Sequence, residues 1–188
     1  MVMPHNTRVW TREEVWALPD DGKRYELIAG ELLVSPSPGG MHQRALARLY
    51  DLVAPYVRSH GLGETLFSPA DLQLQRGDIS QPDLFVIPPG WDGRDWEACG
   101  VPLLIAEILS PSTARYDRIT KRSRYQQSGV GEYWIVDIDA RVIERWTPGD
   151  ARPEVLAETI SWQPAGALNP LIIDLEEYFR EVTGTDGR

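Results

Sequence analysis

Two acidic residues in otherwise apolar segments are the first candidates for chemistry. Glu107 lies inside the apolar run Leu103-Leu-Ile-Ala-Glu-Ile-Leu109, which has the composition of a strand covered on both faces. An ionised carboxylate in such a strand is costly unless it is paired or binds a metal ion. Asp83 begins a second apolar run, Asp83-Leu-Phe-Val-Ile87, directly after Pro82. If the two runs form neighbouring strands, their carboxylates can share one hard divalent cation, and magnesium fits this oxygen-rich setting best, with manganese as a substitute.

A cation held in this way could assist the hydrolysis of a phosphate ester. It would polarise a phosphoryl oxygen and lower the pKa of a bound water molecule. Lys121 follows Glu107 by one predicted helix, so its side chain can reach the same pocket. The ammonium group could orient the attacking water or stabilise the charge that develops in the transition state. Asp83 is expected at the margin of the sheet, with its side chain pointing into solvent.

Each of these residues also has an ordinary structural interpretation. Asp83 alone could be a strand-end carboxylate, which is common after proline, and Lys121 could be a solvated helix lysine. A glutamate within an apolar strand is harder to explain without a site. Only Lys23 and Lys121 are lysines among the 19 basic residues, and a compact ammonium that can lose its proton differs chemically from a guanidinium. This rarity gives weak support to a special role for Lys121.

Basic residues crowd into the segment that contains Lys121. Five of them fall within ten positions: Arg115, Arg118, Lys121, Arg122 and Arg124. The cluster could be a solvated helix face, but it borders the predicted metal, so we expect Arg115, Arg118 and Arg122 to contact nucleic-acid phosphates.

The overall charge argues against a protein that coats nucleic acid. A net charge of −9 and a pI near 4.8 argue against a broad basic surface. A carboxylate-lined metal site is itself acidic, however, and the bound cation reverses its local sign. A nuclease therefore remains compatible with this composition.

Length and composition also restrict the architecture. A chain of 188 residues with 42% hydrophobic content can bury the core of one domain, expected over residues 1–188. The sequence contains no run of about 18 apolar residues, so no membrane span is predicted. The first ten residues lack the apolar stretch of a signal peptide, and a cytoplasmic location is therefore expected. Cys99 is the single cysteine, which excludes an internal disulfide and a cysteine zinc cluster. Any metal must be held by oxygen or imidazole.

The elements that must position these residues follow from turn signals and hydrophobic periodicity. Thr11-Arg-Glu-Glu14 has the form of a capping box, which predicts a short helix with Trp16 and Leu18 in the core. A hairpin is predicted from strands at 25–28 and 31–34.

The rest of the chain continues the alternation of helices and strands. The further predicted elements are a long helix at 41–60, a strand pair or one bent strand at 64–76, central strands at 83–87 and 103–109, a polar helix at 113–127, strands at 132–137 and 141–146, a strand near 154–160, and a last helix opened by Asp174 with Glu177 as its capping partner. This order predicts an α/β or α+β fold, with a mixed sheet that has helices on each side.

Short segments distributed over most of the chain resemble one known family. They are Tyr25-Glu-Leu-Ile-Ala-Gly-Glu31, Ser35-Pro-Ser-Pro38, His42, Gln81-Pro-Asp83, Ala106-Glu-Ile-Leu-Ser-Pro-Ser-Thr113, Tyr116-Asp-Arg118, Lys121, Tyr125, Gly129-Val130 and Glu132-Tyr-Trp-Ile-Val-Asp137. Each segment alone is weak, but the combination resembles the Uma2 family of restriction-endonuclease-like proteins, from about Tyr25 to Trp146.

The resemblance implies a fold, an activity and further site residues. The family is grouped with the PD-(D/E)XK nucleases, which implies a mixed central sheet flanked by helices, here with an extra amino-terminal hairpin and a carboxy-terminal helix, and Mg-dependent cleavage of DNA. Glu26 corresponds to an additional acidic residue near the metal, and His42 could face the same cleft. Each also has an ordinary structural interpretation. Glu26 could be an outward-facing residue of the hairpin, and His42 could be an ordinary histidine at the start of a helix. The residue two positions after Glu107 is Leu109 where the parent motif has lysine, and the resemblance suggests that Lys121 replaces it.

The leading hypothesis is therefore a Mg-dependent endonuclease that acts on DNA, with Asp83, Glu107, Lys121 and Glu26 as catalytic residues and Asp83 and Glu107 as metal ligands. The alternative is a non-catalytic metal-binding or scaffold protein that keeps the fold, and a third hypothesis is a hydrolase of smaller phosphate esters. No membrane partner is expected. A homodimer is a further hypothesis, with Trp91 and Trp96 as an exposed contact surface.

Overall fold

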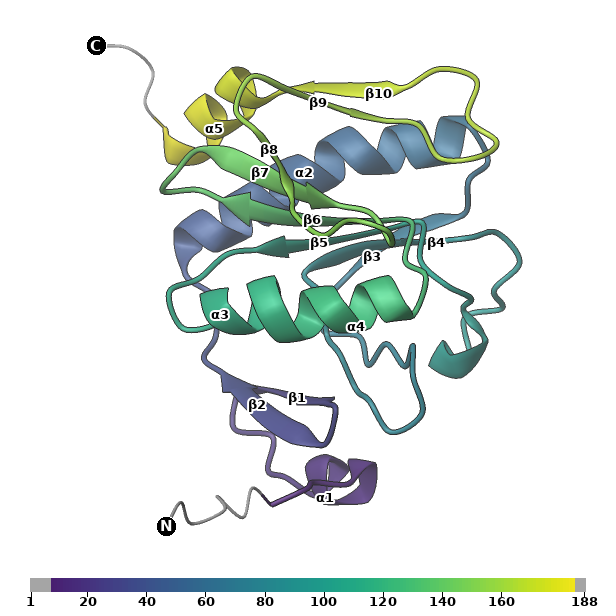
Figure 1. Ribbon diagram of the computed structural model, residues 1–188, viewed down its shortest axis with the longest axis vertical. Helices are drawn as coiled ribbons and strands as arrows, with labels where there is room; N and C mark the ends of the chain where they lie inside the picture. Colours follow the sequence, from purple (N-terminus) through teal and green to yellow (C-terminus); the bar gives the residue numbers. More distant parts are fainter. Residues whose placement is uncertain (1–7, 185–188) are drawn as a thin grey trace.

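A computed structural model describes residues 8–184, and a six-stranded sheet forms its centre (Figure 1). The strand order is β3-β4-β5-β6-β7-β8. The strands are β3 Glu64–Phe67, β4 Leu84–Ile87, β5 Leu104–Ile108, β6 Glu132–Asp137, β7 Val142–Trp146 and β8 Glu154–Leu156. Strands β5 and β6 pair in parallel, and the other neighbours in this sheet pair antiparallel. The predicted mixed sheet is confirmed, with the two apolar runs as its adjacent strands β4 and β5.

Helices cover both faces of this sheet. The long helix α2, Gly40–Ser59, and the carboxy-terminal helix α5, Leu175–Thr183, lie on one face (Figure 1). The other face carries a continuous helical segment, composed of α3 Ala114–Tyr116, the π-helical turn η2 Asp117–Lys121, and α4 Arg122–Gln127. The two remaining short helices are α1 Arg12–Trp16 and the 3-10 helix η1 Trp96–Ala98. The predicted order of helices and strands is therefore confirmed.

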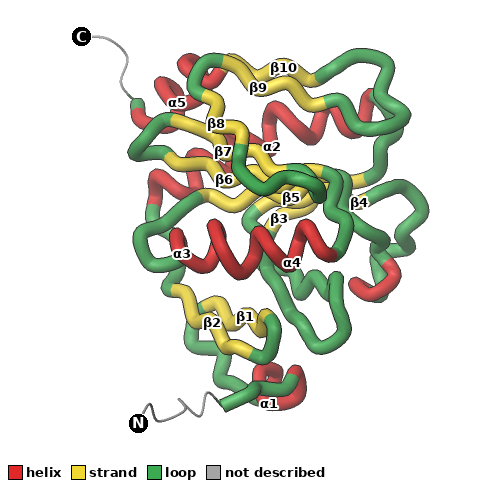
Figure 2. The backbone as a smooth tube through the Cα atoms, in the orientation of Figure 1, coloured by secondary structure: helices red, strands yellow, loops and turns green. Residues whose placement is uncertain are grey.

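Two small hairpins lie outside the central sheet (Figure 2). Strands β1 Arg24–Ile28 and β2 Glu31–Ser35 form the predicted amino-terminal hairpin, on the side of α3 and α4. Leu27 exchanges two backbone hydrogen bonds with Ile79, of 2.8 and 2.7 Å, which attach the hairpin to the segment that leads into β4. Strands β9 Thr159–Trp162 and β10 Leu171–Asp174 form the second hairpin, beside α5 and α2.

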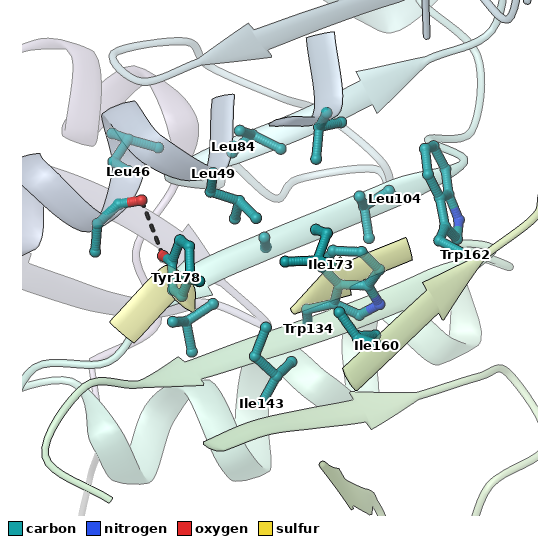
Figure 3. Packing of buried hydrophobic residues seen from close by; sticks show 14 of the residues in the cluster. Leu46, Leu49, Leu84, Leu104, Trp134, Ile143, Ile160, Trp162, Ile173 and Tyr178 are labelled. Carbon is teal, nitrogen blue, oxygen red and sulfur yellow. Dashed lines mark hydrogen bonds between the residues drawn. The ribbon is translucent and has the colours of Figure 1, made fainter. Parts of the chain in front are cut away.

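The main core fills the space between α2, α5 and one face of the sheet (Figure 3). Side chains alternate along β5, so Leu104 and Ala106 pack into this core while Ile105 packs on the opposite face. Trp134 of β6 is fully buried here, and the Tyr178 hydroxyl of α5 donates a 2.9 Å hydrogen bond to a carbonyl of α2. This packing fixes which face of β5 remains for Glu107.

The structure corrects several predicted details at the amino-terminal side. The capping box at Thr11 is confirmed, but α1 ends at Trp16, whose side chain is 53% exposed. Its five residues form little more than one turn, which is too short to bring Trp16 onto the core. The predicted strand at 64–76 ends at Phe67, and the chain beyond it is irregular apart from an isolated bridge between Leu72 and Ser80.

Other corrections concern the carboxy-terminal strands and the tryptophan loop. The strand predicted near 154–160 is divided into β8 and β9, and β10 was not predicted. The last helix begins at its predicted cap, since Asp174 accepts a 2.9 Å hydrogen bond from the amide of Glu177. Trp91 and Trp96 were expected to be exposed, but they stack with ring centroids 4.6 Å apart and pack, half-buried, against the second core. No helix within residues 8–184 has the length and apolar character needed to cross a membrane.

Candidate active site

A cleft of about 580 Å³ lies between the amino-terminal hairpin, the start of α2, the ends of β5 and β6, and the helical segment α3–η2. The loops at 35–39, 109–114 and 137–140 contribute to its walls. Seven charged or titratable side chains gather at its inner surface: Arg24, Glu26, His42, Asp83, Glu107, Asp117 and Lys121. They include the four residues predicted from the sequence to be catalytic.

Strand pairing places Asp83 beside Glu107. Leu84 pairs with Ala106 in the antiparallel ladder, so one further step in the same register sets Asp83 opposite Glu107. Leu84 and Ala106 both face the α2 core, and alternation therefore turns the two carboxylates to the face covered by η2 and α4. Each of these acidic residues is 2% exposed. The expected solvent exposure of Asp83 was wrong, because the hairpin and α2 cover this end of the sheet.

Three donors stabilise the Asp83 carboxylate. Arg24 Nη1 lies 2.9 Å from Oδ1, while His42 Nε2 and the amide nitrogen of Ile108 lie 3.0 and 2.8 Å from Oδ2. Burial opposes ionisation, but the His42 hydrogen bond and the charges of His42 and Arg24 outweigh it and lower the pKa of Asp83 to about 2. Asp83 is therefore held as an anion.

Lys121 is surrounded by carboxylates. Its Nζ lies 2.9 Å from Glu107 Oε1, 3.0 Å from Glu26 Oε2 and 3.6 Å from Asp117 Oδ1. The side chain is buried on the sheet side of η2. Burial alone would lower the pKa of Lys121, but the negative charges of Glu107 and Glu26 raise it well above its usual value. The solvated helix lysine is thus excluded, and the residue provides a permanently charged ammonium inside the cleft.

Glu26 and Tyr125 complete the contacts around this ammonium. Glu26 is 1% exposed, and its Oε1 accepts a 2.8 Å hydrogen bond from the amide of Gln81. The Tyr125 hydroxyl donates a 3.3 Å hydrogen bond to Glu107 Oε1. Glu26 is consequently part of the site and is not an outward hairpin residue. Tyr125 is buried in the second hydrophobic core.

Two of the four carboxylates are difficult to ionise. Burial raises the pKa of Glu107 well above its usual range, and the charges of Asp83 and Asp117 raise it further against the opposing effect of Lys121. Burial also raises the pKa of Asp117, again against the effect of Lys121. Both pKa values are raised for the same reason, which is that several carboxylates lie close together in a site shielded from water.

The donor set fits a hard divalent cation by chemistry and by charge. Glu26, Asp83, Glu107 and Asp117 can carry four negative charges, while Lys121, Arg24 and a protonated His42 can supply three positive ones. A divalent cation would add positive charge where carboxylates outnumber cationic side chains, and carboxylate oxygen is the ligand that magnesium and manganese prefer. Within residues 8–184, no three Asp, Glu, His or Cys side chains are already arranged as a metal site. The Lys121 ammonium separates Glu26 from Glu107, so side chains must turn to form one.

The arginines predicted to contact phosphate lie outside the cleft. Arg118 binds Asp137 and Glu144 at 2.9 and 2.7 Å, and Arg122 lies 4.9 Å above the ring of Trp146. Arg115 is exposed. The basic cluster of the sequence is therefore dispersed by the fold, because neighbouring strands supply acidic and aromatic partners for its members.

Two site residues, Asp117 and Arg24, were not predicted, and only the position of Asp117 carried a signal. Asp117 lies four residues before Lys121, a spacing that brings two side chains together on one helical face. Arg24 adjoins the hairpin strand that contains Glu26, but the sequence gives no sign that it reaches Asp83 across the fold.

Comparisons with known proteins agree with this architecture. A crystal structure described as a "putative nuclease belonging to DUF820" from Anabaena variabilis superimposes with a TM-score of 0.72, covering 92% of this chain and 99% of that one at 20% sequence identity. Among curated proteins, none matches the chain significantly. The sequence pattern of the Uma2 family, described as "Putative restriction endonuclease", matches residues 12–176. With a match that extends from α1 to α5, the chain belongs to the Uma2 family.

Proposed function

We propose that this protein is a magnesium-dependent endonuclease that hydrolyses phosphodiester bonds in DNA. The observation that carries the proposal is the buried arrangement of Asp83, Glu107 and Lys121 at the floor of one cleft. Membership of a family described as a putative restriction endonuclease supports a nuclease of this kind. The nuclease description of the Anabaena variabilis protein points in the same direction.

Asp83 and Glu107 are the residues proposed to hold the cation. A bound magnesium ion would supply Lewis acidity toward a phosphoryl oxygen and a bound water. Arg24 and His42 keep Asp83 ionised and fix its orientation beside Glu107. Glu107 faces it from the adjacent strand, which is rigid because β5 pairs with strands on both sides.

Lys121 is proposed to replace the lysine that the parent motif places at position 109. Its ammonium lies 2.9 Å from Glu107, so the positive charge is present beside the ligand although it comes from a different element. In that place it can orient a water molecule or stabilise negative charge that develops on the phosphate. Glu26 accepts the second ionic contact of Lys121 and thereby holds the ammonium in the cleft.

His42 and the arginines are proposed to contact the nucleic acid. His42 lines the cleft, and its Nδ1 has no hydrogen-bond partner among the described residues. Arg115 is exposed and follows Ala114, which lines the cleft, so it is the best placed of the three predicted arginines. Arg118 and Arg122 would have to leave their present partners to bind phosphate.

Purified protein incubated with plasmid DNA, single strands and RNA in magnesium, manganese or EDTA tests the proposal. We expect cleavage of DNA that requires the cation and falls by about 100-fold or more in E107Q, which removes a ligand charge but keeps the side-chain shape. D139N is the matched control, because Asp139 lies on the exposed rim of the same cleft. Cleavage that persists in EDTA or in E107Q would contradict the assignment.

A non-catalytic scaffold is the second candidate, and one observation favours it. Lys121 already neutralises part of the carboxylate cluster, and no three potential ligands are arranged for a metal within residues 8–184. Absence of cleavage in magnesium and in manganese, together with no binding of either ion at millimolar concentration, would support this candidate. A homodimer is a further proposal for the nuclease, since two clefts could act on two strands, and sedimentation analysis tests it.

A further inference from the structure

Asp117 differs from every other carboxylate of the cleft in its contacts. It is the first residue of η2, is 1% exposed and lines the cleft. Neither of its carboxylate oxygens has a hydrogen-bond partner within residues 8–184. The Thr113 hydroxyl lies nearby without the geometry of a hydrogen bond, and the nearest cation, Lys121, is 3.6 Å away. Among the described residues, this buried carboxylate thus has one long ion pair and lacks the hydrogen bonds that a buried charge normally has.

The other three buried carboxylates each accept at least one hydrogen bond, although Glu26 Oε2 has only its ion pair with Lys121. Asp83 has three donors, Glu107 accepts hydrogen bonds from Lys121 and Tyr125, and Glu26 accepts one from the amide of Gln81 in addition to its ion pair. Among these four carboxylates, Asp117 therefore has the fewest partners within the described residues.

The backbone explains why Asp117 faces the cleft. The segment Asp117–Lys121 is a π-helical turn, a feature that is frequent at functional sites. Both ends of this turn are buried, so Asp117 and Lys121 point to the same side, toward Glu107. The exposed residue of the turn, Ile119, points away. The turn thus brings an anion and a cation together at the cleft floor.

We propose that Asp117 is a further ligand of the divalent cation in this cleft, additional to Asp83 and Glu107. The proposal rests on the metal-dependent function put forward above. The cation would then lie beside Asp117, the buried carboxylate that accepts no hydrogen bond from the described residues. The Lys121 ammonium would remain paired with Glu26. Three carboxylates from two strands and one helix would then enclose the cation.

Direct cation binding by the full-length protein tests the assignment. Manganese binding would be measured by calorimetry and by the loss of the free-ion signal in electron paramagnetic resonance, for the wild type, D117N and D139N. We expect D117N to raise the Kd for manganese by at least about tenfold, and D139N to leave it unchanged, because that rim residue is exposed.

Thermal unfolding provides a second measurement that also monitors folding. In EDTA, D117N is expected to melt at or above the wild-type Tm, because it removes a buried charge that has no hydrogen-bond partner. Manganese should raise the Tm of D117N by less than it raises the Tm of the wild type, because a ligand that binds more weakly stabilises the folded protein less at the same concentration. D117S gives the same comparison if D117N does not fold.

The outcomes separate this inference from the proposed function. If the wild type, D117N and D139N all bind manganese equally, the assignment of Asp117 is overturned while the metal site stands. The same holds if D117N slows cleavage without weakening binding, since Asp117 would then only position Lys121. If the wild type binds no manganese at millimolar concentration, the proposed metal-dependent function fails and this inference fails with it.

Discussion

At the scale of single residues, the two lysines of the chain occupy opposite environments. Lys23 is exposed and pairs with Asp21 at 2.6 Å on the surface. Lys121 is buried among Glu26, Glu107 and Asp117. A surface ion pair contributes little to stability, whereas a buried charge that loses its partner is strongly unfavourable. The same residue type therefore serves as solvated surface in one place and as the electrostatic centre of a site in the other.

Replacement of Lys121 by methionine should destabilise the metal-free protein by about 3–5 kcal/mol, because it leaves three buried carboxylates without their ammonium. Urea unfolding in EDTA at neutral pH measures this. K23M is the control and should leave the unfolding midpoint almost unchanged. Equal midpoints for the two variants would mean that Lys121 is not the charge that holds the cluster together.

At the scale of elements, the site depends on how separate pieces are fastened to one another. The hairpin supplies Glu26 and the helical segment supplies Asp117 and Lys121, and the Tyr116 hydroxyl links them through a 2.7 Å hydrogen bond to Glu31. Burial and this hydrogen bond raise the pKa of Tyr116 to about 12. The Tyr116 hydroxyl therefore keeps its proton, and can donate to Glu31, up to about pH 12.

This link predicts a pH dependence at the alkaline end. The folded-state pKa of Tyr116 lies above its usual value of 10.0, so the stabilisation is fully present below pH 10.0 and is lost as pH rises through about 12. The difference in unfolding free energy between the wild type and Y116F should shrink across this window. Urea unfolding at stepped pH values measures it, and a constant difference from pH 9 to pH 12 would exclude the mechanism.

The register between β5 and the segment before β6 depends on a glycine. A Cβ atom at position 131 would lie 2.5 Å from the carbonyl oxygen of Leu103, and the neighbouring Glu132 amide donates to that same oxygen. G131A should therefore cost about 1–3 kcal/mol, because backbone must shift to relieve the overlap. Gly149, where a Cβ meets nothing within 4 Å, provides the control variant G149A. A stability of G131A equal to that of G149A in urea unfolding would show that this approach is not close in solution.

At the scale of the whole molecule, one core connects distant parts of the chain. It joins residues of α2, β4, β5, β6, β7, β9, β10 and α5, including Leu49, Leu84, Trp134 and Phe179. Helices α2 and α5 lie far apart in sequence but pack on each other and on the same sheet face (Figure 3). These helices and strands bury their apolar side chains against one another in this shared core.

This shared core predicts that the chain unfolds as one domain. We expect a single cooperative transition in urea, with the same midpoint by far-ultraviolet circular dichroism and by tryptophan fluorescence, because Trp134 and Trp162 both lie inside the main core. L49A should lower the stability by about 2–5 kcal/mol and shift both signals together. Two separated midpoints would indicate independent units and would contradict a single domain.

The sequence by itself determined the elements and the anchor of the site. Apolar runs and caps are local signals, so the strands around Glu107 and the helices at 41–60 and from Asp174 were predicted correctly. A glutamate in a buried strand indicates a site, because the free-energy cost of burying a carboxylate can be inferred from the strand alone. The alternation of β5 then fixed the face on which its partners had to lie.

Only the tertiary structure decided which charges meet. The register of β4 with β5 places Asp83 opposite Glu107, and the docking of η2 brings Lys121 and Asp117 onto them. In the same position of η2, the Arg118 side chain pairs with Asp137 and does not line the cleft. Local patterns cannot give these pairings, because electrostatic partners are selected by three-dimensional proximity between elements that are distant along the chain.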